Sequence, residues 1–258
     1  MTLLDKLKET QTGFTCLSDT TDVGANAEFE QAYLQVRDKE GRLLNDDQVY
    51  RLPVADPSNP HDKEWQCRQH SAGLVDEYLQ QRQFSRSDWI LDIGCGNGWF
   101  SHLVAKTTAA TVLAIDINHT ELEQASRVFR RDNLYFASLD LLRDSAQLEP
   151  CSLIFFNSCF QYFNQPKALL DLCLSLLDRG GEIHILDSPF YPPEQVAAAK
   201  TRSQDYYQQL ETAQMNPFYH HHSDTLFAQY QLQWLYQPLP KSERSGAVSP
   251  FAWFKITR

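Results

Sequence analysis

The chain has 258 residues and a formal net charge of -10, with 42% hydrophobic and 22% charged residues, values typical of a globular protein. The acidic balance and the lack of a lysine–arginine cluster disfavour a nucleic-acid partner, because such binding depends on neutralising phosphates. No apolar run reaches the ~18 residues that cross a bilayer and the N-terminus lacks the apolar core of a secretory signal, so we expect a cytoplasmic monomer or homodimer with no membrane partner.

Residues 1–62 are polar and rich in turns, and we interpret them as an N-terminal extension that ends in a proline-rich linker. The domain proper covers residues 63–258 and begins with a helix whose apolar face carries Leu74, Val75 and Leu79. The segment 189–226 does not continue the strand and helix pattern. We expect it to be a helical lid insertion.

Apolar strands alternate with helical patterns from Trp89 onward. Five strands are predicted, at 89–93, 111–115, 134–139, 152–156 and 182–186. This alternation is typical of a parallel sheet with helices on both faces. Two later strands, near 231–236 and 251–256, are expected to form an antiparallel hairpin at the C-terminal edge. Thr120 and Glu123 have the spacing of a capping box at the start of one helix.

A glycine-rich loop follows the first strand of the domain. Gly94, Gly96 and Gly98 would let a ligand approach the backbone just before a helix N-terminus. Asp116 ends the next strand, 22 positions after Gly94 (116 minus 94), which fits an acid that accepts both ribose hydroxyl hydrogens. The loop is therefore expected to bind a nucleoside.

Asp92 helps to decide which nucleoside is bound. It lies two positions before the first glycine, where a carboxylate would repel the pyrophosphate of a dinucleotide. The same carboxylate would attract a cationic ligand without phosphate. A nicotinamide-dependent oxidoreductase is therefore disfavoured, as it also is by the G-x-G-x-G spacing.

Several motifs together resemble the class I S-adenosylmethionine-dependent methyltransferases. Residues 91–100 resemble their first motif, 112–118 the second, 137–140 the third, 153–158 with Gln161 and Tyr162 the fourth, and 177–181 the turn before the fifth strand. The resemblance implies an α/β fold with a Rossmann-like, doubly wound, seven-stranded sheet, mostly parallel with an antiparallel C-terminal edge strand. It also implies S-adenosyl-L-methionine as cofactor.

The resemblance assigns cofactor contacts residue by residue. Asp92, Gly94, Cys95, Gly96 and Gly98 would surround the methionine half, Asp116 the ribose, Ile117, Asp140 and Leu141 the adenine, and Asn157 the sulfonium side. Three assignments have structural alternatives. Asp116 could cap the following helix, Asp140 could cap the turn at Leu141, and Asn157 could simply end its strand.

The acceptor pocket is expected over the fourth and fifth strands, near Phe160, Tyr162, Asp187 and Tyr191. Tyr162 and His221 are the catalytic candidates. The histidines at 220–222 could supply a general base or form a solvated loop, and no metal site is predicted because adjacent residues point in different directions. The tyrosines of the insertion could equally form its own small core.

Arg68 lies one helical turn after Glu64, so it could form an exposed ion pair or reach the cofactor's carboxylate. The main hypothesis is methyl transfer to an oxygen, nitrogen or carbon of a small molecule. The alternative is a non-catalytic, cofactor-binding domain that acts as an interaction module. Methylation of a protein also stays open, because a fold does not fix its substrate.

Overall fold

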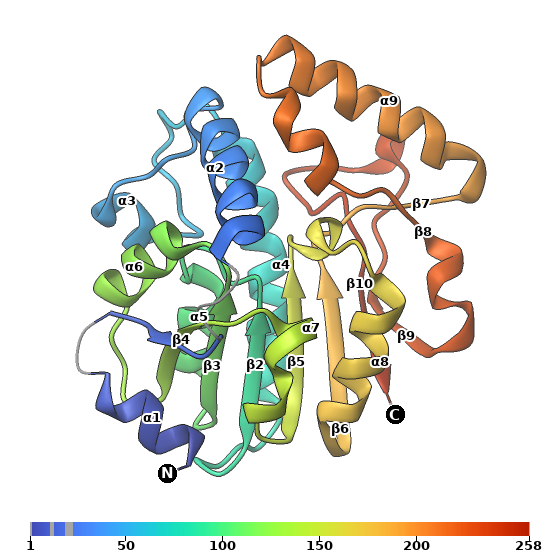
Figure 1. Cartoon of the computed structure of the whole chain (residues 1–258). Helices are drawn as coiled ribbons and strands as arrows, with labels where there is room; N and C mark the ends of the chain where they lie inside the picture. Colours follow the sequence, from blue (N-terminus) through green and yellow to red (C-terminus); the bar gives the residue numbers. More distant parts are fainter. Residues whose placement is uncertain (1, 11–12, 19–22, 258) are drawn as a thin grey trace.

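The computed structural model describes residues 2–10, 13–18 and 23–257 and is built on one large mixed sheet (Figure 1). Its strand order is β1-β4-β3-β2-β5-β6-β10-β9. The strands are β1 (Thr15–Cys16), β2 (Trp89–Ile93), β3 (Thr111–Asp116), β4 (Leu134–Ser138), β5 (Cys151–Asn157), β6 (Leu177–Leu186), β9 (Gln231–Tyr236) and β10 (Trp253–Thr257). Strands β1 to β6 pair in parallel, and β10 pairs antiparallel with β6 and β9. The predicted sheet and its antiparallel edge hairpin are confirmed.

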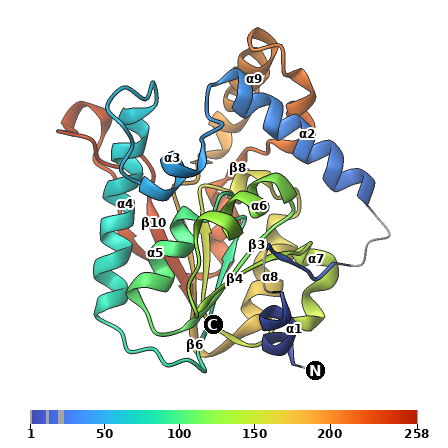
Figure 2. The ribbon, with the colours of Figure 1, turned by 90° about the vertical axis from the view of Figure 1, so that its left-hand side faces the viewer.

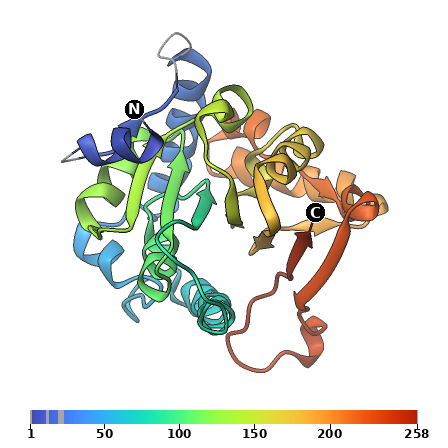
Figure 3. The same cartoon turned by 90° about the horizontal axis from the view of Figure 1, so that it is seen from below.

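Two helical layers cover the sheet, as Figure 3 shows from below. The helices are α1 (Leu3–Glu9), α2 (Val23–Lys39), α3 (Asp46–Arg51), α4 (Asp62–Gln80), α5 (Trp99–Thr107), α6 (His119–Val128), α7 (Leu141–Asp144), α8 (Pro166–Leu176) and α9 (Pro193–Gln209). Side chains alternate along β2, so Leu91 packs in the cluster with α1, α7 and α8, and Ile90 packs with α4, α5 and α6. Each face of the sheet therefore has its own apolar core.

Two local features differ from the predictions. The sheet has an eighth strand, because Thr15 and Cys16 of the extension pair with the outer edge of β4. A strand of two residues has no periodicity that a sequence pattern could reveal. Helix α6 is capped by Asn118, whose side chain accepts from the Glu121 backbone N–H at 3.0 Å, and not by the predicted Thr120 box.

Two segments lie above the carboxyl ends of the parallel strands: helix α2 of the extension, and residues 190–223 (Figures 1 and 2). The second segment contains β7 (Phe190–Tyr191), α9, the 3₁₀ helix η4 (Ala213–Phe218) and β8 (His222–Ser223). The 3₁₀ helix η5 (Asp224–Gln229) follows it, and its Phe227 packs in the core cluster that contains α8. Tyr33 and Val36 of α2 pack against Tyr207 and Met215 in a separate buried cluster. The two segments thus form one roof over the strand ends. Within the described residues, none of the helices is long and apolar enough to cross a membrane.

Candidate functional site

Three neighbouring cavities lie between the carboxyl ends of the strands and the roof. The large cavity has a volume of about 450 Å³ and lies over the ends of β3 and β4. The small cavity, of about 80 Å³, lies over the glycine loop, and the outer cavity, of about 330 Å³, lies between α2 and α9. Tyr33 and Ser158 line all three, so the cavities are adjoining parts of one site.

The glycine loop brings its backbone directly to the cavity walls. Gly94 and Gly96 line both the large and the small cavity. The φ of Gly96 is +52°, and a Cβ there would lie only 3.0 Å from Glu121 Oε2. Glycine is needed at this position because a side chain would be strained and would enter the space left for a ligand.

Asp116 lines the large cavity at the end of β3. Its Oδ2 accepts from the Gly96 N–H at 2.8 Å, and its Oδ1 accepts from the Ile117 and Asn118 N–H groups at 2.7 and 2.9 Å. Burial raises the pKa of this carboxyl, while the three N–H donors oppose the rise. The carboxylate is thus fixed in one orientation, and about one of its four lone-pair sites, on Oδ2, stays free for a ligand hydroxyl.

Asp92 and Gly98 are not among the residues that line these cavities, and their predicted contact with the ligand stays a prediction. Asp92 is 2% exposed and accepts a hydrogen bond from Ser101 Oγ, and burial raises its pKa to about 7. Gly98 has a φ of +77°, and a Cβ there would lie 2.7 Å from Phe136 and 2.9 Å from Ala125. Both residues shape the loop from behind its ligand-facing side.

The other predicted cofactor contacts divide between two cavities. Ile117, Asp140 and Leu141 line the large cavity, whereas Cys95, Asn157 and Arg68 line the small one. Asn157 Oδ1 is buried and has no hydrogen-bond partner among the described residues. A buried acceptor without a donor is costly, so this atom fits a ligand that brings an N–H group.

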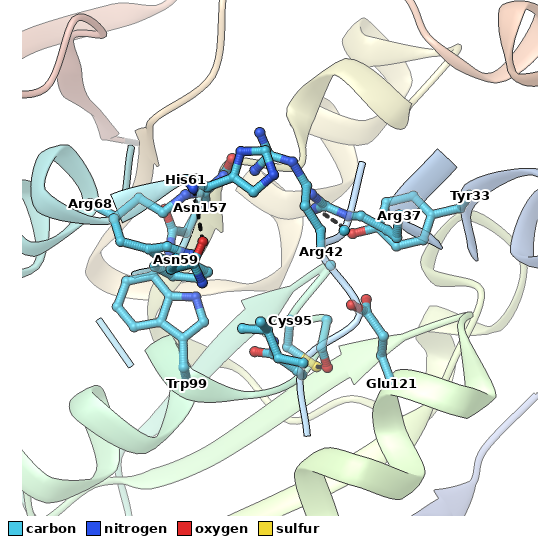
Figure 4. A pocket seen from close by; sticks show the side chains of 17 residues that line it. Tyr33, Arg37, Arg42, Asn59, His61, Arg68, Cys95, Trp99, Glu121 and Asn157 are labelled. Carbon is cyan, nitrogen blue, oxygen red and sulfur yellow. Dashed lines mark hydrogen bonds between the residues drawn. The ribbon is translucent and has the colours of Figure 1, made fainter. Parts of the chain in front are cut away.

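Two charged residues that sequence reasoning missed face each other across the small cavity (Figure 4). Glu121 lies on the first turn of α6 and Arg37 on the last turn of α2. Burial raises the pKa of Glu121 to about 7, and the charge of Asp116 adds to this while that of Arg37 opposes it. Glutamate is common on the first turn of a helix, where it stabilises the helix end. The sequence alone therefore did not single out Glu121 as a residue of the site.

Arg42 and Arg68 share the carboxylate of Glu64. Arg42 makes two hydrogen bonds to it, at 2.9 and 2.6 Å, and Arg68 Nη2 lies 2.9 Å from Oε1. Arg42 Nε also lies 2.9 Å from Glu40 Oε2. The ion pair that was one of the two alternatives for Arg68 is therefore present, and Arg68 lines the small cavity as well.

The two catalytic candidates have different positions. Tyr162, at the end of the 3₁₀ helix η3 (Phe160–Tyr162), lines the large and outer cavities. His221 is not among the lining residues of the three cavities, and its Nε2 lies 2.8 Å from Ser203 Oγ of α9. The neighbouring His220 lines the large cavity, and the catalytic role of His221 stays a prediction.

The remaining acceptor candidates also separate. Tyr191 lines the outer cavity. Asp187 is 7% exposed and accepts from Ser71 Oγ at 2.8 Å and Ser249 Oγ at 2.7 Å, so it joins α4 and the C-terminal segment to β6. Among the described residues, no group of three His, Cys, Asp or Glu side chains is placed to hold a metal ion.

Residues 90–181 match a family model described as a methyltransferase domain. A malonyl-[acyl-carrier protein] O-methyltransferase of Acetivibrio thermocellus is 30% identical over 121 residues, 46% of this chain and 42% of that protein. A second protein of that name, from Ilyobacter polytropus, is 33% identical over 96 residues, 36% of this chain and 37% of the relative. The matches thus span only about two fifths of each relative's length.

Solved structures share the fold at low sequence identity. A geranyl diphosphate methyltransferase in complex with GPP and sinefungin has a TM-score of 0.56 and 15% identity, covering 90% of this chain and 97% of that chain. The plantazolicin methyltransferase BpumL in complex with S-adenosylhomocysteine has a TM-score of 0.54 and 18% identity, covering 91% and 100%. The two alignments therefore cover most of this chain.

Proposed function

We propose that this chain, whose residues 90–181 form a class I S-adenosylmethionine-dependent methyltransferase domain, transfers a methyl group from that cofactor to a small-molecule acceptor. The observation that supports this most strongly is Asp116, a carboxylate fixed by three backbone N–H groups at the wall of a cavity of about 450 Å³. This arrangement suits a ribose hydroxyl that donates to the free lone-pair site on Oδ2.

The residues present fit the cofactor along its whole length. Ile117 and Leu141 offer apolar contact to adenine in the large cavity, and Asp140 lies beside them at its edge. In the small cavity, the unpartnered Oδ1 of Asn157 suits the ammonium group of the methionine half. Arg68, in the same wall, suits its carboxylate.

When bound, S-adenosylmethionine supplies an electrophilic methyl group on a positively charged sulfur. The chain's own part is to orient the acceptor and exclude water, since an in-line displacement depends on alignment. Burial raises the pKa of Tyr162, so its hydroxyl stays protonated near neutral pH. The hydroxyl can then position the methyl acceptor by donating a hydrogen bond to it. Burial lowers the pKa of His220, so its imidazole is neutral there and can take a proton.

A small acceptor is favoured over a macromolecule because the site is roofed. Tyr162 and Tyr219 lie beneath α2 and α9 in the outer cavity, whose volume is about 330 Å³. The named relatives act on a malonyl group carried by a protein, but they match less than half of this chain. The lining of the cavity itself is therefore the better guide to the acceptor.

The proposal is tested by following the methyl label. The purified full-length chain is incubated with methyl-tritiated S-adenosylmethionine and a metabolite extract, and the products are separated by size. We expect label in the low-molecular-mass fraction, and its loss when Asp116→Asn is used in place of the wild type. Label that appears only in protein or nucleic acid would contradict a small-molecule acceptor.

A further inference from the structure

We propose that the acceptor is an organic carboxylate held by Arg37 at the border of the small and outer cavities. This inference rests on the proposed function and names the substrate class of the same site. The outer cavity is lined by four arginines and two glutamates: Arg37, Arg42, Arg68, Arg202, Glu40 and Glu64. The cavity is therefore basic, although the whole chain has a net charge of -10.

The four arginines are not equivalent. Arg42 and Arg68 are neutralised by Glu64 and Glu40. Arg202 is exposed on α9 and its charge is screened by solvent. Arg37 is partly buried and, among the described residues, has no carboxylate within ion-pairing distance of its guanidinium. Its Nη2 donates a hydrogen bond to the hydroxyl oxygen of Tyr33, at 2.6 Å.

A guanidinium carries five N–H donors, and this bond uses one of them. Removing a cation from water without a directly bonded counter-charge is costly, and Glu121 acts on Arg37 only from across the small cavity, so Arg37 fits a site that an anion completes. Its planar group suits the two oxygens of a carboxylate. Arg42 and Arg68 already have carboxylate partners, so Arg37 alone of these three offers a guanidinium without one. Its single positive charge matches a singly charged carboxylate better than a doubly charged phosphate.

The cofactor's own carboxylate is the competing occupant, and the geometry separates the two. Figure 4 shows Arg68 next to Asn157 and Trp99 at one end of the small cavity, with Arg37 and Tyr33 above Glu121 at the other end. Arg68 and Asn157 thus lie together where the methionine half is proposed. Arg37 lies on the side that continues into the outer cavity.

The walls beyond Arg37 are apolar and aromatic. They include Tyr162, Tyr207, Tyr219 and Met215, and Met215 is 1% exposed. The rings of Tyr33 and Tyr162 meet edge to face with centroids 5.7 Å apart, and those of Tyr162 and Tyr219 with centroids 5.9 Å apart. These surfaces favour an acceptor with a flat or apolar body attached to its carboxylate, and not a free inorganic anion.

The test compares matched acids and amides on the full-length chain saturated with S-adenosylhomocysteine. The probes are benzoate, phenylacetate and hexanoate, each paired with its neutral amide, and binding is followed by ligand-observed NMR. We expect at least one acid to bind 10-fold or more tightly than its amide. Arg37→Gln should abolish that preference, Arg37→Lys should retain part of it, and Arg130→Gln, an exposed arginine beyond the end of α6, should retain it fully.

Two results would overturn the inference while leaving the proposed function intact. One is that no acid is preferred over its amide. The other is that Arg37→Gln weakens S-adenosylhomocysteine binding 10-fold or more without acceptor, which would assign Arg37 to the cofactor. Failure of the wild type to bind S-adenosylhomocysteine would instead contradict the proposed function, so the two failures are distinguishable.

Discussion

At the scale of single residues, the site is defined by a few charged groups whose surroundings set their behaviour. Three backbone N–H groups hold the Asp116 carboxylate in place. Among the described residues, the side chain of Glu121 makes no hydrogen bond. Both carboxyls have a raised pKa because they are buried at a cavity wall. A cationic ligand would compensate for that burial, whereas a phosphate would add to the repulsion.

Because of Glu121, we expect the ratio of the affinities for S-adenosylmethionine, the cationic cofactor, and S-adenosylhomocysteine, its neutral product, to depend on pH. Its pKa is about 7, so the carboxyl is mostly protonated at pH 6 and ionised at pH 8. Only S-adenosylmethionine carries the sulfonium charge. We therefore expect its affinity, relative to that of S-adenosylhomocysteine, to rise several-fold between these pH values.

Calorimetric titrations at pH 6, 7 and 8 measure this ratio. Glu121→Gln should flatten the dependence, while Glu123→Gln, an exposed glutamate on the same helix, should leave it unchanged. If the affinity ratio changes with pH as steeply in Glu121→Gln as in the wild type, another group causes the pH dependence. Asp92, whose pKa is also about 7, would then be the first to examine.

At the scale of elements, the parts that the sequence predicted are those with a strong local pattern. The apolar strands and the spacing from Gly94 to Asp116 both follow from rules of parallel sheets. The position of Arg37 does not, because it depends on how α2 packs over the strand ends. The choice between His220 and His221 depends on an irregular loop, where no periodicity fixes the direction of a side chain.

Helix α4 and strands β6 and β10 are joined by one buried carboxylate at the far end of the sheet from the site. Glu182 accepts hydrogen bonds from Tyr78, Arg82, His184 and Lys255, at 2.6, 2.5, 3.1 and 2.7 Å. Burial acts to raise the pKa of Glu182, but these four partners outweigh it and hold the pKa well below its usual range. A carboxyl of this kind stabilises the fold above its unfolded pKa and loses that contribution as the pH falls.

Glu182→Gln should therefore lower the free energy of unfolding by about 2–3 kcal/mol at pH 7, because two cations lose their counter-charge. Urea unfolding at pH 7 and at pH 3.5 measures the effect, which should shrink at the lower pH. Glu77→Gln, which changes an exposed glutamate on α4, is the control. A loss of equal size at both pH values would mean that packing, and not charge, explains the effect.

At the scale of the whole molecule, a parallel sheet positions the site and the roof closes it. The strand ends supply the glycine loop and Asp116, and α2 brings Tyr33 and Arg37 from a segment more than 50 residues earlier in the chain (94 minus 37 is 57). The basic outer cavity lies inside an otherwise acidic protein. This separation of charge favours a cationic nucleoside beside the acids and an anionic acceptor beside the arginines.

We propose that the crevice above the glycine loop binds S-adenosylmethionine through Asp116. Calorimetric titration of the full-length chain with S-adenosylhomocysteine and with NAD measures this binding. We predict binding of S-adenosylhomocysteine, a loss of at least ~10-fold in affinity in Asp116→Asn, and no binding of NAD. Binding of NAD, or an unchanged affinity for S-adenosylhomocysteine in Asp116→Asn, would contradict the account.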